Sequence, residues 1–130
     1  MGLILKRGLL AGFASLAIGL IFNWIVGIVL PGVAAEYQNQ YLFRPWTDPL
    51  MIVYFGYPFI AGIALAYLWG RLAKTNAFDF AKLYFLVATI PGMFVTYTSF
   101  QVSLAMVLCW TVNGFIQAFV AGVVFTKLKK

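Results

Sequence analysis

The sequence predicts an all-α integral membrane protein, in which four transmembrane helices form a compact antiparallel up-down bundle. The first observation is that no charged residue lies inside four long apolar runs: Gly8–Leu30, Leu50–Gly70, Leu83–Phe100 and Val102–Thr126. Each run is about as long as a helix must be to cross a hydrocarbon core of roughly 30 Å. The second is that 64% of the 130 residues are hydrophobic and only 9% are charged, whereas about a quarter are charged in soluble domains.

The composition also restricts the chemistry that this single domain, residues 1–130, can carry out. The chain has no histidine and a single cysteine, Cys109. A haem or a metal held by histidine, a histidine general base and an internal disulfide are therefore excluded within the chain. We expect no catalytic residue, no metal site and no cofactor, and we interpret Cys109 as a small buried hydrophobic residue.

The distribution of positive charge predicts the orientation. Eight of the nine basic residues fall on one side of the predicted topology: Lys6, Arg7, Arg71, Lys74, Lys82, Lys127, Lys129 and Lys130. Only Arg44 falls on the other side. Lys and Arg in short loops mark the cytoplasmic side, so both termini are expected there, in a prokaryotic cytoplasmic membrane. Because the charges lie at helix ends, the net charge of +6 indicates membrane orientation and not a nucleic-acid partner.

Local signals set the limits of the four helices, at about residues 6–30, 49–72, 77–98 and 100–126, with an outer loop at about 31–48. Pro31-Gly32 ends the first helix, and Asp48-Pro49 begins the second. Asn76 and Asp79 form a capping-box pattern for the third helix, in which Asp79 can also pair with Lys82. The same spacing in Thr98 and Gln101 predicts the start of the fourth.

Each predicted helix carries one stripe of small residues, through which membrane helices approach closely. The first has Gly8, Gly12, Ser15, Gly19 and Asn23; the second Gly62, Ala66 and Gly70; the third Thr89, Gly92, Thr96 and Ser99; the fourth Gly114, Ala118 and Gly122. We expect these stripes to join the four helices of one bundle. The alternative is that one stripe faces another membrane subunit or a second copy of the chain.

Five polar residues inside the runs are candidates for a polar interior or pore: Asn23, Asn113, Gln117, Thr89 and Thr96. A buried amide must be hydrogen-bonded, so we expect Asn23 and Asn113 to meet between the first and fourth helices. The alternative is that they line a polar cavity. Pro58 and Pro91 each remove a backbone donor and should kink their helices, with Thr89 and Thr96 placed to cover freed carbonyl groups.

The outer loop holds the remaining candidates, which could dock a partner or a lipid headgroup: Glu36, Tyr41, Arg44, Trp46 and Asp48. Arg44 can pair with Glu36 or Asp48, or bind a lipid phosphate. The alternative is that the loop only anchors the first two helices at the membrane surface.

These observations favour a non-catalytic accessory or assembly subunit, or a helix-bundle interaction protein. Its expected partners are the lipid bilayer and, through a small-residue stripe, another membrane subunit or a second copy of the chain. A second hypothesis is a small channel or transporter for an uncharged or amphipathic solute, because no charge inside the runs could balance a charged one. A third, less favoured, is a membrane enzyme acting on a lipid or quinone-like substrate.

Overall fold

The computed structural model describes residues 1–72 and 74–128 and is all-helical, with no strand in that part of the chain. The elements are α1 (Gly2–Val29), α2 (Pro31–Glu36), α3 (Leu50–Tyr54), α4 (Tyr57–Arg71), α5 (Ala77–Tyr84), the π-helix η1 (Phe85–Thr89), α6 (Ile90–Ser99) and α7 (Leu104–Lys127). Four helical spans are long and apolar enough to cross a membrane: α1, α3 with α4, α5 through α6, and α7.

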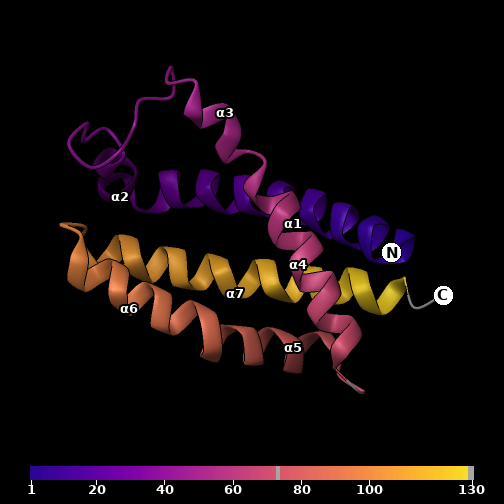
Figure 1. Cartoon of the computed structure of the whole chain (residues 1–130). Helices are drawn as coiled ribbons and strands as arrows, with labels where there is room; N and C mark the ends of the chain where they lie inside the picture. Colours follow the sequence, from indigo (N-terminus) through magenta and orange to yellow (C-terminus); the bar gives the residue numbers. More distant parts are fainter. Residues whose placement is uncertain (73, 129–130) are drawn as a thin grey trace.

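The first turn of α1 and the last turn of α7 lie at the same end of the molecule. Figure 1 shows these turns, the end of α4 and the start of α5 at this terminus end, while α2 and the turn from α6 to α7 lie at the opposite, loop end. The guanidinium of Arg7 donates two hydrogen bonds, at 3.0 and 2.7 Å, to the Leu128 carbonyl. This contact ties the first turns of α1 to the end of α7.

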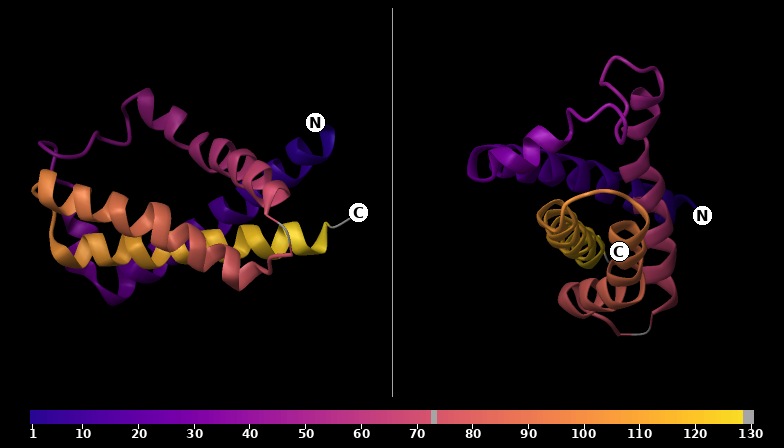
Figure 2. Two further views of the ribbon diagram at one scale, coloured as in Figure 1. Left: turned by 60° about the horizontal axis from the view of Figure 1, so that its bottom comes forward. Right: turned by 90° about the vertical axis from the view of Figure 1, so that its left-hand side faces the viewer.

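The most extensive contacts between helices are those of α1 with α4, α1 with α7, and α5 with α7. Helix α4 crosses α1 near the terminus end, and α3 lies away from α6 and α7 in every view (Figures 1 and 2). The four spans therefore pack most tightly at the terminus end and separate towards the loop end.

An aromatic core fills the terminus end. Trp69 lies 5.2 Å from Phe80 and 5.6 Å from Phe125, measured between ring centroids, and Phe80 and Phe125 are completely buried. Tilted and edge-to-face aromatic pairs add about 0.5–1.5 kcal/mol each beyond the area that they bury. This core joins α4, α5 and α7.

Glycines allow the backbones of α1 and α4 to touch. A Cβ atom on Gly12 would lie 2.7 Å from the Cα of Phe59, and one on Gly8 would lie 2.5 Å from the Cα of Ile63. A Cβ on Gly62 would overlap the Gly8 carbonyl oxygen. The small-residue stripes predicted for the first two helices thus meet each other within the chain.

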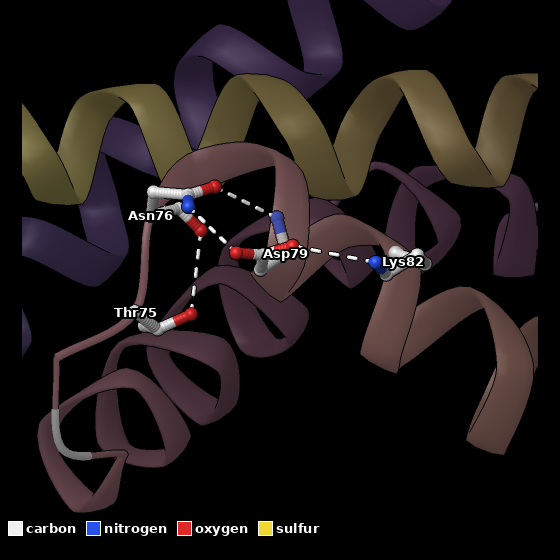
Figure 3. A network of polar contacts seen from close by, with 4 residues as sticks. All are labelled: Thr75, Asn76, Asp79 and Lys82. Atoms are coloured by element: carbon white, nitrogen blue, oxygen red, sulfur yellow. Dashed lines mark hydrogen bonds and ion pairs between the residues drawn. The ribbon is translucent and has the colours of Figure 1, made fainter.

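The cap predicted for the third span is confirmed. The backbone N–H of Asp79 donates to Asn76 Oδ1 at 2.9 Å, and Asn76 Nδ2 donates to the Asp79 carboxylate at 2.6 Å (Figure 3). Lys82 Nζ lies 3.4 Å from Asp79 Oδ1, so the predicted ion pair is confirmed too. The backbone N–H of Asp79, one of the four donors that a helix N-terminus leaves without an intrahelical partner, is therefore satisfied by the cap.

The cap predicted for the fourth span is wrong. Thr98 lies inside α6, and its hydroxyl donates to the Phe94 carbonyl at 3.0 Å. The cap of α7 is Ser103, whose hydroxyl oxygen accepts from the Met106 N–H at 3.1 Å. Thr98 and Gln101 do not form a helix cap, because α6 continues through Ser99.

Both internal prolines lie where an α-helix begins again. Pro58 is in the first turn of α4, after a break at Phe55 and Gly56, and Pro91 is in the first turn of α6, directly after η1. A proline lacks a backbone donor, and its ring collides with the carbonyl four residues earlier in a regular helix. The break before Pro58 and the π-helix before Pro91 accommodate the missing donor and the ring of each proline.

Candidate functional site

The loop end carries the main concentration of polar and aromatic contacts between distant parts of the chain. Glu36, at the end of α2, accepts a hydrogen bond at 3.3 Å from the backbone N–H of Ser103, the cap of α7. The indole Nε1 of Trp110 in α7 donates to the hydroxyl oxygen of Tyr37 at 2.6 Å. These bonds hold the segment that follows α1 against the first turns of α7.

An aromatic cluster of Tyr37, Phe43 and Trp110 surrounds the second bond. The ring of Phe43 lies 5.2 Å from that of Tyr37 and 6.2 Å from that of Trp110, the latter edge-on. Burial in this cluster raises the pKa of Tyr37, and the hydrogen bond from Trp110 offsets only part of that rise. The phenol therefore stays neutral at and well above physiological pH, which suits a rigid apolar wall.

A small apolar cavity of about 200 Å³ lies beside the cluster. Its lining comes from the outer loop, the end of α6, the following turn and α7: Leu42, Phe43, Thr96, Phe100, Val102 and Trp110. The Thr96 hydroxyl donates to the Gly92 carbonyl at 2.8 Å. Small-molecule pockets are typically about 300–1,000 Å³, so this cavity has room for part of an apolar ligand.

A second, polar cavity of about 390 Å³ shares Leu42 and Phe43 with the first. Arg44 and Asp48 both line it, and their Nη1 and Oδ2 atoms lie 3.0 Å apart. Asp48 Oδ1 accepts from the Leu50 N–H at 2.9 Å. This backbone bond, and then Arg44, hold the pKa of Asp48 below its ordinary value, so a fixed carboxylate lies beside a fixed guanidinium.

The other outer-loop candidates lie apart from this ion pair. Tyr41 lines the polar cavity but is fully exposed, and Trp46 is 64% exposed with its ring 6.2 Å from that of Phe55. Glu36 bonds to Ser103 and not to Arg44. Of the two partners considered for Arg44, the structure therefore selects Asp48.

The five candidates for a polar interior do not form one group, although two of them, Asn113 and Gln117, are bonded to each other. Gln117 Nε2 donates to Asn113 Oδ1 at 3.3 Å, both from α7, and the Gln117 amide lies against Gly19 of α1. Thr89 is buried against Gly114, while Thr96 lines the apolar cavity. We expected Thr89 and Thr96 to bond the carbonyl group that Pro91 leaves without a donor. In the described residues neither does so, and the Thr96 hydroxyl bonds to the Gly92 carbonyl instead.

The predicted contact between Asn23 and Asn113 is wrong. Asn23 is exposed on α1 and makes no side-chain hydrogen bond to residues 1–72 or 74–128. The small-residue stripe of α1 is buried at Gly8, Gly12 and Gly19. The helices separate towards the loop end, so the last member of the stripe is left uncovered.

The aromatic cluster and most residues of the apolar lining were not predicted from the sequence. Tyr37 and Trp110 are 73 positions apart, so no local pattern links them. The sequence does show tyrosine and tryptophan near the expected membrane surface. This enrichment indicates how deep in the membrane these side chains lie, but not which of them contact each other.

The charged side chains of the loop end are few and already paired. No group of three or more His, Cys, Asp or Glu side chains within 1–72 and 74–128 is placed to hold a metal ion. The nearby carboxylates, Glu36 and Asp48, are each engaged in hydrogen bonds. Comparison with protein-family models, with curated proteins and with solved structures found no match to the chain.

Proposed function

We propose that the protein crosses the bilayer four times as an antiparallel up-down bundle and acts, without catalysis, as a subunit that binds another membrane chain through its helices. In this proposal both termini are cytoplasmic, because Lys6, Arg7, Arg71 and Lys127 belong to the terminus end and Lys and Arg mark the inner side. A prokaryotic cytoplasmic membrane is the proposed location.

The observation that carries the subunit proposal is the exposed amide of Asn23. It lies in α1, seven residues before Leu30, which is about 10 Å below that end at 1.5 Å per residue. An amide facing hydrocarbon without a hydrogen bond costs roughly 1–3 kcal/mol by protein mutational data. A polar group from another chain would remove that cost.

The surroundings of Asn23 support a helix as the partner. The exposed α1 face consists of Leu20, Asn23, Trp24 and Gly27, which lie within roughly 100° of one another at 3.6 residues per turn. Leu20 is 54% exposed and Trp24 is 69% exposed. A Cβ atom on Gly27 would meet no heavy atom within 4 Å, so another backbone can approach there.

The closed terminus end argues against the alternative of a channel or transporter. Trp69, Phe80 and Phe125 are packed together there, and the described cavities both lie at the loop end. A solute path through one chain would require this aromatic core to separate.

The test is the mass of the native protein after mild detergent extraction, measured by native mass spectrometry. We expect a complex with a mass greater than that of one chain, which contains the same partner in every preparation. Asn23→Leu should reduce that complex without lowering thermal stability, because Asn23 contributes no hydrogen bond to the described chain. The matched control is Phe94→Leu, an exposed position on α6.

Two results would overturn the proposal. One is a monodisperse single chain with no companion, and the other is a complex that Asn23→Leu and Phe94→Leu leave equally intact. If Asn23→Leu instead lowered the unfolding temperature of the isolated chain, Asn23 would have a structural role within the bundle.

A further inference from the structure

We propose that the two loop-end cavities together bind one phospholipid with a zwitterionic, primary-amine headgroup of the phosphoethanolamine type. The phosphate would meet Arg44, the ammonium would meet Asp48, and the first part of an acyl chain would enter the apolar cavity. This inference rests on the proposed insertion of the four spans, but not on the helix partner.

The shared wall is the first argument. Leu42 and Phe43 line both cavities, so a polar and an apolar space share these two consecutive residues. An amphipathic molecule can occupy both at once, with its polar part beside Arg44 and its apolar part beside Trp110. Neither cavity alone has this character.

The position of the cavities is the second argument. Trp110 lies six residues after Leu104, the first residue of α7, which is about 9 Å along the helix. Phe100 and Val102, in the turn between α6 and α7, line the same cavity. The apolar cavity therefore covers the depth at which the acyl chains of a lipid leave its headgroup, whereas the polar cavity lies in the loop.

Charge complementarity selects the headgroup. Arg44 and Asp48 have 60% and 23% exposed side chains and carry opposite charges 3.0 Å apart. A purely anionic headgroup would place its phosphate beside the Asp48 carboxylate. A zwitterion presents one charge to each partner, and the planar guanidinium of Arg44 suits a phosphate.

Hydrogen bonding distinguishes a primary ammonium from a quaternary one. An ionised carboxylate offers about four lone-pair sites, and Asp48 uses one oxygen for Leu50 and the other for Arg44. The remaining sites can accept N–H donors from a primary ammonium. A choline group has no such donor, so it would interact with Asp48 by charge alone.

The experiment measures lipid retention by native mass spectrometry of the full chain in detergent, with one added lipid at a time. The probes are phosphatidylethanolamine, phosphatidylcholine and phosphatidylglycerol with identical acyl chains. We expect one phosphatidylethanolamine to be retained in preference to the other two. Arg44→Gln and Asp48→Asn should each weaken this retention by between about 1.4-fold and fivefold, the range for exposed ion pairs, whereas Arg71→Gln at the terminus end should not.

A second variant tests the apolar part without disturbing the ion pair. Val102→Phe should fill the apolar cavity and lower retention of all three lipids, and Val112→Phe, at an exposed position of α7, should not. Equal retention of the three lipids, or equal effects of these variants and their controls, would overturn the proposal. Extraction of the protein from membranes by alkaline carbonate would contradict the proposed insertion instead, so the two failures are distinguishable.

Discussion

Trp110 Nε1 and Tyr37 Oη lie 2.6 Å apart and join α7 to the first residue after α2. Both side chains are partly buried, and the Trp110 ring also lines the apolar cavity. One hydrogen bond therefore holds the outer loop in place and fixes one wall of the proposed lipid site.

Tyr37→Phe should destabilise the protein by about 1–3 kcal/mol, because it leaves the partly buried indole N–H without an acceptor. The measurement is the free energy of unfolding in detergent. Tyr41→Phe is the matched control, since Tyr41 is fully exposed, and it should change little. If the two substitutions had equal effects, the bond to Trp110 would not stabilise the fold.

The same tyrosine predicts a loss of stability in alkali. Burial raises the pKa of Tyr37 above the ordinary value of 10.0, so the folded state favours the neutral phenol. This contribution is complete below about pH 10 and is lost as the pH rises through the folded pKa. Between pH 9 and the folded pKa, wild type should lose more unfolding free energy than Tyr37→Phe; parallel pH profiles would contradict this assignment.

Gly62→Ala should be strongly destabilising, by about 1–3 kcal/mol as for other overpacked sites. The added methyl group would overlap the Gly8 carbonyl oxygen and push α4 away from α1. Gly92→Ala is the control, because its Cβ would meet no heavy atom within 4 Å, and alanine in a helix is favoured over glycine by up to about 1 kcal/mol. Thermal unfolding of both variants compares a contact position with an open one.

Asn76→Ala should cost roughly 0.5–2 kcal/mol, the range for loss of an N-cap side chain. The amide of Asp79 would lose its acceptor at Asn76 Oδ1 (Figure 3). Hydrogen exchange at Asp79 and neighbouring amides of α5 should accelerate, and Asn76→Ser should restore protection. Unchanged exchange in Asn76→Ala would show that tertiary packing, and not the cap, holds this turn.

The helical class and the four spans could be predicted from the sequence because both depend on local composition. Charge-free runs report length and apolarity directly, and the bonds of the Asn76 cap join residues three apart. The stripe of Gly8 and Gly12 indicated a close approach for the same reason.

The identity of each contact could not be predicted, since it depends on how the helices cross. Small residues in α1 fit several partners equally well, and only the structure shows that Gly62 faces Gly8. The exposure of Asn23 follows from the separation of the spans towards the loop end, which no stripe on one helix encodes. The same holds for Tyr37 and Trp110, which meet across 73 positions.

The π-helix η1 sets the rotational phase between the two halves of the third span. At 100° per residue, Thr89 would point about 80° away from Ala81 in an uninterrupted α-helix, yet both are buried and Thr89 contacts α7 at Gly114. The wider turn, closed by the Ile90 amide on the Phe85 carbonyl, advances less per residue and returns Thr89 to that side. A regular α-helix over the same residues would therefore rotate α6 as a unit and turn Thr96 out of the apolar cavity, whereas deleting one residue from 85–89 would restore a regular helix and leave α6 nearly in its present phase.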